Sequence, residues 1–320
     1  MQGGNQVTFR DRIGVNRRNS LFLILAFFVF VLVLGYVIGY AWIGDPVGAL
    51  FGLALALVVG TIAGLLSYFA GDKMVLAASG AEEITHQDAP RLFNVVEEMA
   101  IAGGLPMPKV YIIRDTAPNA FATGRDPEHA SVAVTSGLLD KLDRDELQGV
   151  VAHEMAHVGN YDIRYAMLVG ILVGTTVLIS DFFLRGLWFG GGRGGNSREG
   201  GGYVQVIMLV VAILLAILAP LFARLLQMSI SRQREYLADA TAVRLTRNPD
   251  GLADALQKIS GDREVLEVAN RATAHLYIAN PVKGFEKRAK GLFSTHPPIG
   301  ERIEILRAME TGGTAETVGQ

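Results

Sequence analysis

The sequence predicts a mostly α-helical membrane protein with four transmembrane helices and an α+β domain built around a small β-sheet. Of its 320 residues, 50% are hydrophobic, and its mean hydropathy of +0.33 is too high for an ordinary soluble protein. Four long apolar runs occur in two pairs, and polar segments with helical or alternating patterns lie between and after the pairs. These polar segments are expected to fold together outside the bilayer.

The first pair of apolar runs is expected to form a transmembrane hairpin over residues 21–70. Leu21–Trp42 and Val47–Ala70 are uncharged, and each is long enough as a helix to cross a hydrocarbon core of roughly 30 Å. Gly44-Asp45-Pro46 supplies the turn between them. A signal peptide would have a shorter apolar region and a small-residue cleavage site, so we interpret Leu21–Trp42 as a retained span.

Two GxxxG spacings, Gly48/Gly52 and Gly60/Gly64, lie in the second run. Such spacings allow helices to pack closely in membranes. Glycine is also frequent in membrane helices in general, and we favour this simpler explanation.

The second pair of apolar runs, Tyr165–Phe189 and Tyr203–Ala223, is expected to form another hairpin. Residues 190–202 between them are rich in glycine and are interpreted as a flexible loop. Two spans return the chain to the side that it left. The polar segments before and after this hairpin are therefore expected to face the same compartment.

The charge pattern predicts that this compartment is the cytoplasm. Arg10, Arg12, Arg17 and Arg18 precede the first run, whereas the turn after it contains no Lys or Arg, which places the N-terminus inside. The expected parts are an N-terminal cytoplasmic arm (1–20), a first hairpin (21–70), a first part of the catalytic domain (71–164), a second hairpin (165–223), a second part of the catalytic domain (224–310) and a disordered tail (311–320).

The polar domain is predicted to contain short strands flanked by helices. The predicted elements are a helix over 89–102, strands over 109–113, 120–123 and 131–135, and a helix over 231–245. Asp143, with Glu146 three residues later, has the pattern of a capping box at the start of a further helix.

That further helix carries His153-Glu154-Met155-Ala156-His157, an H-E-x-x-H pattern. Residues four apart lie on one face of a helix, so two neutral imidazoles can bind one Zn²⁺ ion. Glu154 is then placed to take a proton from a zinc-bound water as that water attacks a peptide carbonyl. The sequence contains no Cys, so a further ligand must be a histidine or a carboxylate.

A third ligand is expected beyond the second hairpin, where Glu235 and Asp239 lie four residues apart on one predicted helix. Glu235 could bind zinc while Asp239 holds the ring of a ligating histidine. Alternatively, this helix is exposed, and both carboxylates pair with arginines at 232, 234 or 244. The spacing alone leaves both interpretations open.

One other histidine has a candidate role. His296 lies in the stiff segment Thr295–Pro298, where it could donate a hydrogen bond to the oxyanion that forms at an attacked carbonyl, although an ordinary loop histidine has the same pattern. His86 and His129 lie among polar residues and are expected to be solvated, and His275 is expected to be a surface or satisfied core residue.

Together, these features resemble the HtpX family of membrane-bound zinc metalloproteases. The resemblance extends over essentially the whole chain. It is carried by the H-E-x-x-H pattern, by the hairpin directly after it, and by Pro118–Gly124, Glu235–Ala240 and Phe293–Pro298.

The resemblance implies a gluzincin-type, zincin-like catalytic domain on the cytoplasmic face. It implies one zinc ion per chain, bound by His153, His157 and Glu235, with Glu154 as the general base. It further implies an integral protein of a prokaryotic plasma membrane that cleaves misfolded or damaged membrane proteins in envelope quality control.

The resemblance also implies a substrate-binding strand. In related metalloproteases the chain that matches Asn119–Thr123 is an edge strand that pairs with an extended substrate, which gives Asn119, Phe121 and Ala122 substrate contacts. A turn residue at Asn119 and a core aromatic at Phe121 are the alternatives.

Other classes of function fit less of the sequence. A catalytically idle zinc-binding membrane protein, acting as a holdase or assembly factor, would share the ligands but is expected to lack Glu154. A transporter is expected to carry ionisable residues at mid-membrane, and the apolar runs are nearly free of them. The net charge of −2 and the lack of a basic stripe give no basis for nucleic-acid binding. The expected partners are polypeptide substrates and the lipid bilayer, and no oligomeric state is predicted.

Overall fold

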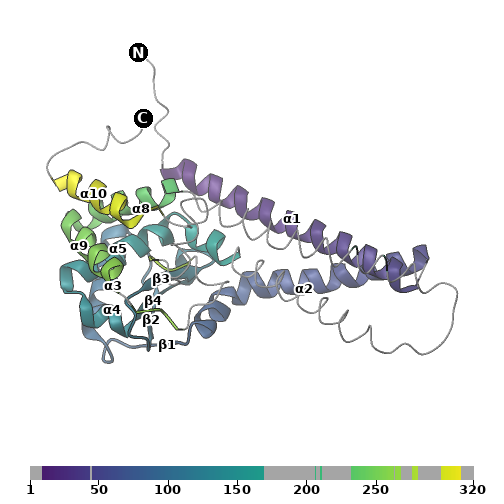
Figure 1. Ribbon diagram of the computed structural model, residues 1–320, viewed down its shortest axis with the longest axis horizontal. Coiled ribbons are helices and arrows are strands. Elements are labelled where there is room, and N and C mark those ends of the chain that lie inside the picture. The colour runs from purple at the N-terminus through teal and green to yellow at the C-terminus, as the bar shows by residue number, and fades with distance from the viewer. Residues whose placement is uncertain are drawn as a thin grey trace, which may run out of the picture. The chain divides into compact units, whose positions relative to one another are not determined.

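The computed structural model describes residues 9–43, 45–168, 206, 210, 232–262, 264–267, 276–279 and 297–310 (Figure 1). The chain forms two compact units. One comprises Met1–Arg17, Gly71–Met167 and Gln227–Gln320, and the other comprises Arg18–Ala70 and Leu168–Leu226. Most of the second predicted hairpin, including its Gly-rich loop, and the predicted disordered tail lie outside the described residues.

Two long helices cover the first predicted hairpin: α1 is Phe9–Ile43 and α2 is Pro46–Ala78. Asp45 caps α2, because its side chain accepts a hydrogen bond from the backbone N–H of Gly48 at 2.8 Å. Both helices are longer than the predicted spans, since α1 begins within the arm and α2 continues beyond Ala70. The apolar run ends at Ala70, but the helix-forming residues after it allow the helix to continue.

α2 is long and apolar enough to cross a membrane, and no other helix within the described ranges meets both conditions. The apolar stretch of α1, Ile24–Val37, is shorter. For the other three predicted transmembrane helices, the prediction therefore rests on the sequence alone.

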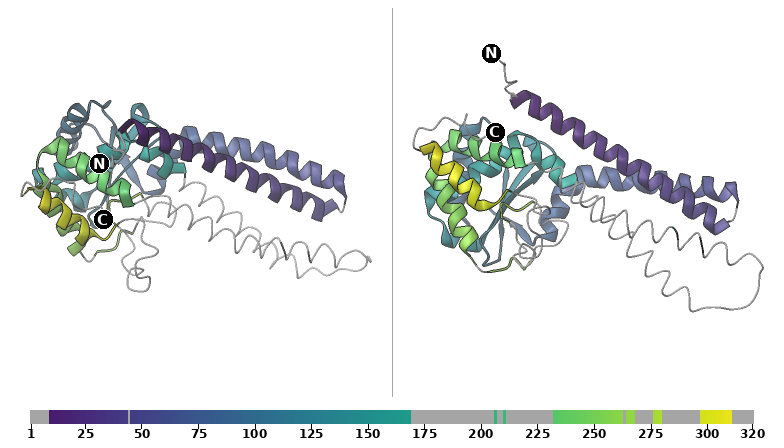
Figure 2. Two further views of the ribbon diagram at one scale, coloured as in Figure 1. Left: turned by 90° about the horizontal axis from the view of Figure 1, so that it is seen from above. Right: turned by 45° about the horizontal axis from the view of Figure 1, so that its top comes forward.

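The helices α1 and α2 lie side by side (Figure 2) and approach each other closely at glycines. A Cβ atom built on Gly35 would lie 2.6 Å from the carbonyl oxygen of Gly52, and one built on Gly39 would lie 2.8 Å from the Cα of Gly52. The carbonyl of Gly48 faces Gly39 at a similarly close approach. No side chain fits at Gly35, Gly39 or Gly52, so close helix packing, rather than the general abundance of glycine in membranes, explains Gly52.

The second glycine pair has a different environment. Cβ atoms built on Gly60 and Gly64 would lie 3.6 and 3.3 Å from the ring of Phe28, so these positions face a side chain rather than a backbone. The simpler explanation that we favour for the two GxxxG pairs is therefore wrong for Gly52.

The sheet has four strands in the order β1-β2-β4-β3. They are β1 (Ala81–Glu83), β2 (Lys109–Ile113), β3 (Ala120–Gly124) and β4 (Ala130–Thr135). β2 and β4 pair in parallel and the other pairs are antiparallel, so the sheet is mixed and β3 lies at its edge. The small predicted sheet is confirmed; β1 escapes prediction because three residues are too few to show alternation.

Helices pack around this sheet. The described ones are α3 (Pro90–Gly103), α4 (Ser136–Lys141), α5 (Arg144–Gly159), α8 (Arg232–Thr246), α9 (Pro249–Gly261) and α10 (Ile299–Glu310), with a 3₁₀ turn η1 at Pro127–His129. The bounds of α3 and α8 differ by one residue from the predicted helices.

Helix α5 is the centre of the unit that contains the sheet, because it contacts α3, α8, α9 and β3. Its apolar residues, including Leu147, Val151 and Met155, are fully buried. The predicted capping box is confirmed: the Asp143 side chain accepts a hydrogen bond from the Glu146 N–H at 3.0 Å, and the Glu146 side chain accepts one from the Asp143 N–H at 2.8 Å. This cap fixes where α5 begins and hence which of its residues face inward.

We expect Gly52→Ala to destabilise the pair of α1 and α2, because the added methyl group would collide with backbone atoms of α1. Overpacking of this kind costs about 1–3 kcal/mol of unfolding free energy. Reversible unfolding in detergent, followed by tryptophan fluorescence, measures the difference.

Gly60→Ala is the matched control for this substitution. Its Cβ would lie 3.5 Å from Val31, which is an ordinary van der Waals contact, so stability should stay near that of the parent protein. Equal unfolding free energies for the two variants would contradict the close glycine packing.

Candidate metal centre

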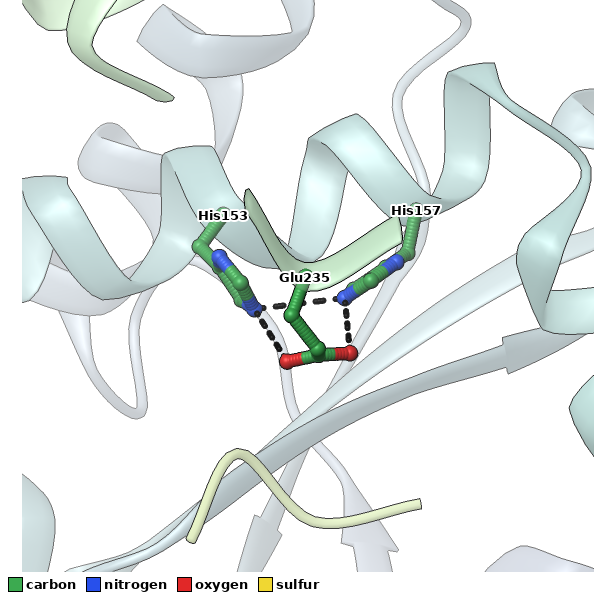
Figure 3. A group of neighbouring side chains, drawn as sticks. All are labelled: His153, His157 and Glu235. Atoms are coloured by element: carbon green, nitrogen blue, oxygen red, sulfur yellow. Dashed lines mark hydrogen bonds and ion pairs between the residues drawn. The ribbon is translucent and has the colours of Figure 1, made fainter. Parts of the chain in front are cut away.

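Two histidines one turn apart on α5 and a glutamate from α8 point toward a common centre (Figure 3). His153 and Glu235 are 1% and 2% exposed, and the side chain of His157 is 16% exposed. Helix α8 packs along α5, which brings Glu235 beside residues that lie about eighty positions earlier in the chain. The alternative of an exposed α8 with solvated carboxylates does not apply to Glu235.

The distances between the three donor atoms test whether a metal ion fits. The Nε2 atoms of His153 and His157 lie 3.2 Å apart, and each lies 3.6 Å from an oxygen of Glu235. Ligands about 2.1 Å from a tetrahedral zinc ion are separated by about 3.4 Å, so the observed spacing fits such an ion. A catalytic zinc site has three protein ligands, and this donor set has the two nitrogens and one carboxylate of that class.

Each histidine is oriented by a carboxylate on its other ring nitrogen. His153 Nδ1 lies 2.9 Å from Asp239 Oδ1, and His157 Nδ1 lies 3.1 Å from Asp162 Oδ2. If Nδ1 carries the proton and donates it to the carboxylate, the lone pair of Nε2 is left for the metal. Asp239 thus lies where the sequence analysis expects it to support a ligating histidine.

Asp162 reaches His157 because the chain reverses after α5. The helix ends at Gly159, and Tyr161 has a positive φ of 61°, a left-handed conformation that turns the chain back. The role of Asp162 is not predicted from the sequence, because no residue pattern there indicates that Tyr161 adopts a left-handed backbone conformation. The position of Asp162 five residues after His157, just beyond the helix, is the one available signal.

The charges around the site favour a bound cation. Although burial opposes it, the hydrogen bond with Asp162 and the charges of Glu235 and Asp162 raise the pKa of His157 to about 9. Burial and the charge of Arg302 work against protonation of His153, but hydrogen bonds to Asp239 and Glu235 raise its pKa as well. Without a metal the site therefore takes up protons, and a metal ion would displace them.

Glu154 lies beside the three donors and is 2% exposed. Burial raises the pKa of its carboxyl, and the charge of Glu235 adds to this effect. The charges of the two histidines and a hydrogen bond from the backbone N–H of Ala122 in β3 oppose the rise. A carboxyl with a raised pKa is a better proton acceptor near neutral pH than an ordinary one.

The three residues predicted to bind substrate lie on or next to β3. Asn119 is buried, and its side chain donates a hydrogen bond to the carbonyl of Ala279 at 3.0 Å. The ring of Phe121 is fully buried and packs edge-to-face on the ring of Tyr277, with centroids 5.1 Å apart. Ala122 is the residue of the three that contacts Glu154.

The remaining histidines fall into two groups. His86 and His129 are on the surface, where they bond to Asn94 and Asp126 as ordinary solvated residues do. His275 and His296 lie outside the described residues, and so does the predicted oxyanion contact of His296.

A further residue missed by the sequence analysis is Arg302 of α10, which is fully buried and forms two hydrogen bonds with Asp239. No local pattern marks it, because its partner lies 63 residues earlier in the chain.

This chain is similar to known proteins over most of its length. A model of peptidase family M48 matches residues 86–310. A protease HtpX homolog of Streptococcus gordonii is 43% identical over 301 residues, and one of Listeria monocytogenes is 47% identical over 305 residues. Each alignment covers 93% of this chain and 99% of the relative. The crystal structure of S. mikatae Ste24p aligns with 92% of this chain and 66% of its own, at 19% identity and a TM-score of 0.45.

We expect His157→Ala to lose bound zinc, because the substitution removes one of three converging donors. The purified variant should retain much less than the parent protein after incubation with zinc and dialysis, as measured by atomic emission.

His129→Ala makes the same chemical change at an exposed histidine and should leave the zinc content unchanged. Equal zinc content in the two variants would argue against the site.

Proposed function

Because this chain belongs to the HtpX family within peptidase family M48, and so is a metalloprotease, we propose that it is a membrane-anchored zinc endopeptidase. We further propose that it cleaves misfolded or damaged membrane proteins. The observation that carries the proposal is the convergence of His153, His157 and Glu235, with the carboxylate of Glu154 beside them.

The proposed chemistry divides between the metal and the protein. A zinc ion held by the three donors would polarise the scissile carbonyl and lower the pKa of water in its open position. Glu154 accepts a proton from the attacking water, whose oxygen bonds to the carbonyl carbon, and passes that proton to the leaving amine as the C–N bond breaks. The burial that raises the pKa of Glu154 suits both transfers.

The carboxylates behind the histidines serve the same chemistry. Asp239 and Asp162 accept hydrogen bonds from the Nδ1 atoms and keep both rings turned toward the metal. Fixed ligands leave the position of the reacting carbonyl fixed relative to Glu154.

We place the substrate along the edge strand β3. Asn119 bonds to Thr135 of β4 through its backbone carbonyl at 3.0 Å, so the alternate residues Ala120, Ala122 and Gly124 direct their backbone groups away from β4. The carbonyl of Ala120 accepts a hydrogen bond from Ile278 N–H at 3.0 Å. A peptide would therefore pair with Gly124 and with Ala122, whose N–H would exchange its bond with Glu154 for one with the peptide, while Asn119 and Phe121 hold the strand in place from behind.

The proposed setting is a prokaryotic plasma membrane with the catalytic domain in the cytoplasm. The four arginines before the first apolar run and the apolar length of α2 support this setting. A protease held there meets the cytoplasmic loops and unfolded ends of membrane proteins, which is consistent with a role in envelope quality control.

A matched cleavage assay tests the proposed function. Zinc-loaded full-length protein in detergent should cleave an unfolded polypeptide such as casein, and Glu154→Gln should lose this activity because an amide cannot accept the proton. The loss should be at least about a hundredfold, the lower end of general-base contributions, with zinc content unchanged.

The assay also separates the alternatives. Inactivity of both proteins with zinc bound would favour the idle zinc-binding holdase, and equal cleavage by both would remove Glu154 from the mechanism.

The substrate strand has its own test. Ala122→Pro removes the outward-facing N–H, which bonds to Glu154 in this structure and would pair with a bound peptide, so casein cleavage should fall at least about tenfold while the fold persists, because proline is tolerated on the outer side of an edge strand. The fall should include a raised KM, because loss of the Glu154 contact alone would lower kcat. Thr123→Pro removes an N–H that faces β4 and should lower the thermal unfolding midpoint instead. Full activity of Ala122→Pro would exclude this position from substrate binding.

A further inference from the structure

Arg302 is the largest fully buried side chain within the described ranges. Arginine is rarely buried unless it is paired, because removing its charge from water is costly. It lies on α10, outside both helices that carry the metal ligands. Its partners therefore show what its burial achieves.

Arg302 forms a two-point contact with Asp239. Its Nε donates to Asp239 Oδ2 at 2.8 Å, and its Nη2 donates to Asp239 Oδ1 at 2.6 Å. The same Oδ1 atom lies 2.9 Å from His153 Nδ1. A continuous line of polar contacts thus runs from α10 through α8 to a metal ligand on α5.

The guanidinium also approaches the metal ligands directly. Its Nη2 lies 3.4 Å from both ring nitrogens of His153, and its Nη1 lies 3.6 Å from Glu235 Oε2. Arg302 therefore contacts both Asp239 and the two ligands nearest to it, which places its planar group where it can fix their relative positions.

The contacts behind His157 are looser. Asp162 lies 3.1 Å from His157 Nδ1, and Arg234 Nη1 lies 3.6 Å from Asp162 Oδ1. The guanidinium of Arg234 also lies over the ring of Tyr165, 4.7 Å from its centroid. The two-point, fully buried contact between an arginine and a carboxylate is therefore the one behind His153.

We propose that Arg302 is a positioning residue of the metal centre, which orients Asp239 so that His153 presents Nε2 to the metal. The proposal rests on the proposed function, since it assigns a role at that same zinc site. A merely structural role is the competing explanation, because Arg302 Nη1 also lies 3.5 Å from the carbonyl of Ile278 and could hold that segment alone.

Zinc affinity, measured by competition with a chromophoric chelator on full-length protein in detergent, separates the two explanations. Arg302→Met and Asp239→Asn should each weaken zinc binding about 10–100-fold, the usual effect of losing a group that orients a metal ligand. Arg302→Lys, which keeps the charge but loses the two-point contact, should recover part of the loss.

The double variant Asp239→Asn/Arg302→Met is the decisive one. If Arg302 acts through Asp239, the zinc affinity of the double variant should be no lower than that of the single variant with the lower affinity. The double variant also removes one charge of each sign and so leaves the net charge of the interior unchanged, which keeps the test usable if a single variant fails to fold.

Arg307→Met is the matched control on the same helix. Arg307 pairs with Asp250 and Asp254 in a partly exposed position, and its loss should leave zinc affinity within about twofold of the parent value.

Two results would overturn the proposal: parent-like zinc affinity in folded Arg302→Met, or losses in the two single variants that multiply in the double variant. If the parent protein itself binds no zinc, the proposed function fails and this proposal with it. If the parent protein and Arg302→Met instead bind zinc equally well, only the proposal for Arg302 fails.

Discussion

Around the two imidazoles on α5, buried carboxylates outnumber the arginines that balance them. Within the described residues, the four carboxylates of Glu154, Asp162, Glu235 and Asp239 meet two guanidinium groups, from Arg234 and Arg302. Four negative and two positive charges leave two negative charges unbalanced, which is the amount that a divalent cation neutralises. Because unbalanced charge in a dry interior is costly, the packing of α8 and α10 against α5 is favoured by added positive charge at this place, which protons on the imidazoles or a divalent cation can supply. Binding of protons or of a cation here is therefore coupled to the packing of these helices.

The fold supplies this arrangement from one central helix. The capping box at Asp143 sets the start of α5, and the left-handed Tyr161 ends the segment by returning Asp162 to the last turn. Between these points, burial on every side gives each inward-facing side chain a defined neighbour: α8 for the histidines and β3 for Glu154. The edge strand, Glu154 and the three converging donors are thus positioned by contacts to a single helix.

The sequence predicts the parts of this site that depend on local geometry. The one-turn spacing of His153 and His157 and the capping box follow from helix periodicity, and the helix that carries Glu235 shows the same periodicity. Asp162 depends on a backbone conformation that tyrosine rarely adopts, and Arg302 depends on packing between helices that are distant in sequence. In the fold, strands of five or six residues bounded by turn-forming residues are predictable from their composition, whereas β1 is defined only by its pairing with β2. In α2, glycine spacing cannot distinguish Gly52 from Gly60 and Gly64, because the distinction depends on which residues of α1 lie opposite.

The hydrogen bond from Ile278 to Ala120 has a consequence for how the enzyme selects its substrates. It occupies one end of the β3 edge of the sheet. Under the proposed function, it leaves a substrate chain only the short stretch of backbone at Ala122 and Gly124, where the Ala122 N–H bonds to Glu154 in this structure. So few main-chain contacts would bind a peptide weakly and would not discriminate between its side chains. Under the proposed function, discrimination would then come from the substrate's own folding equilibrium: a chain segment is cut in proportion to the time that it spends locally unfolded. Such an enzyme would select its substrates by their local stability rather than by their sequence.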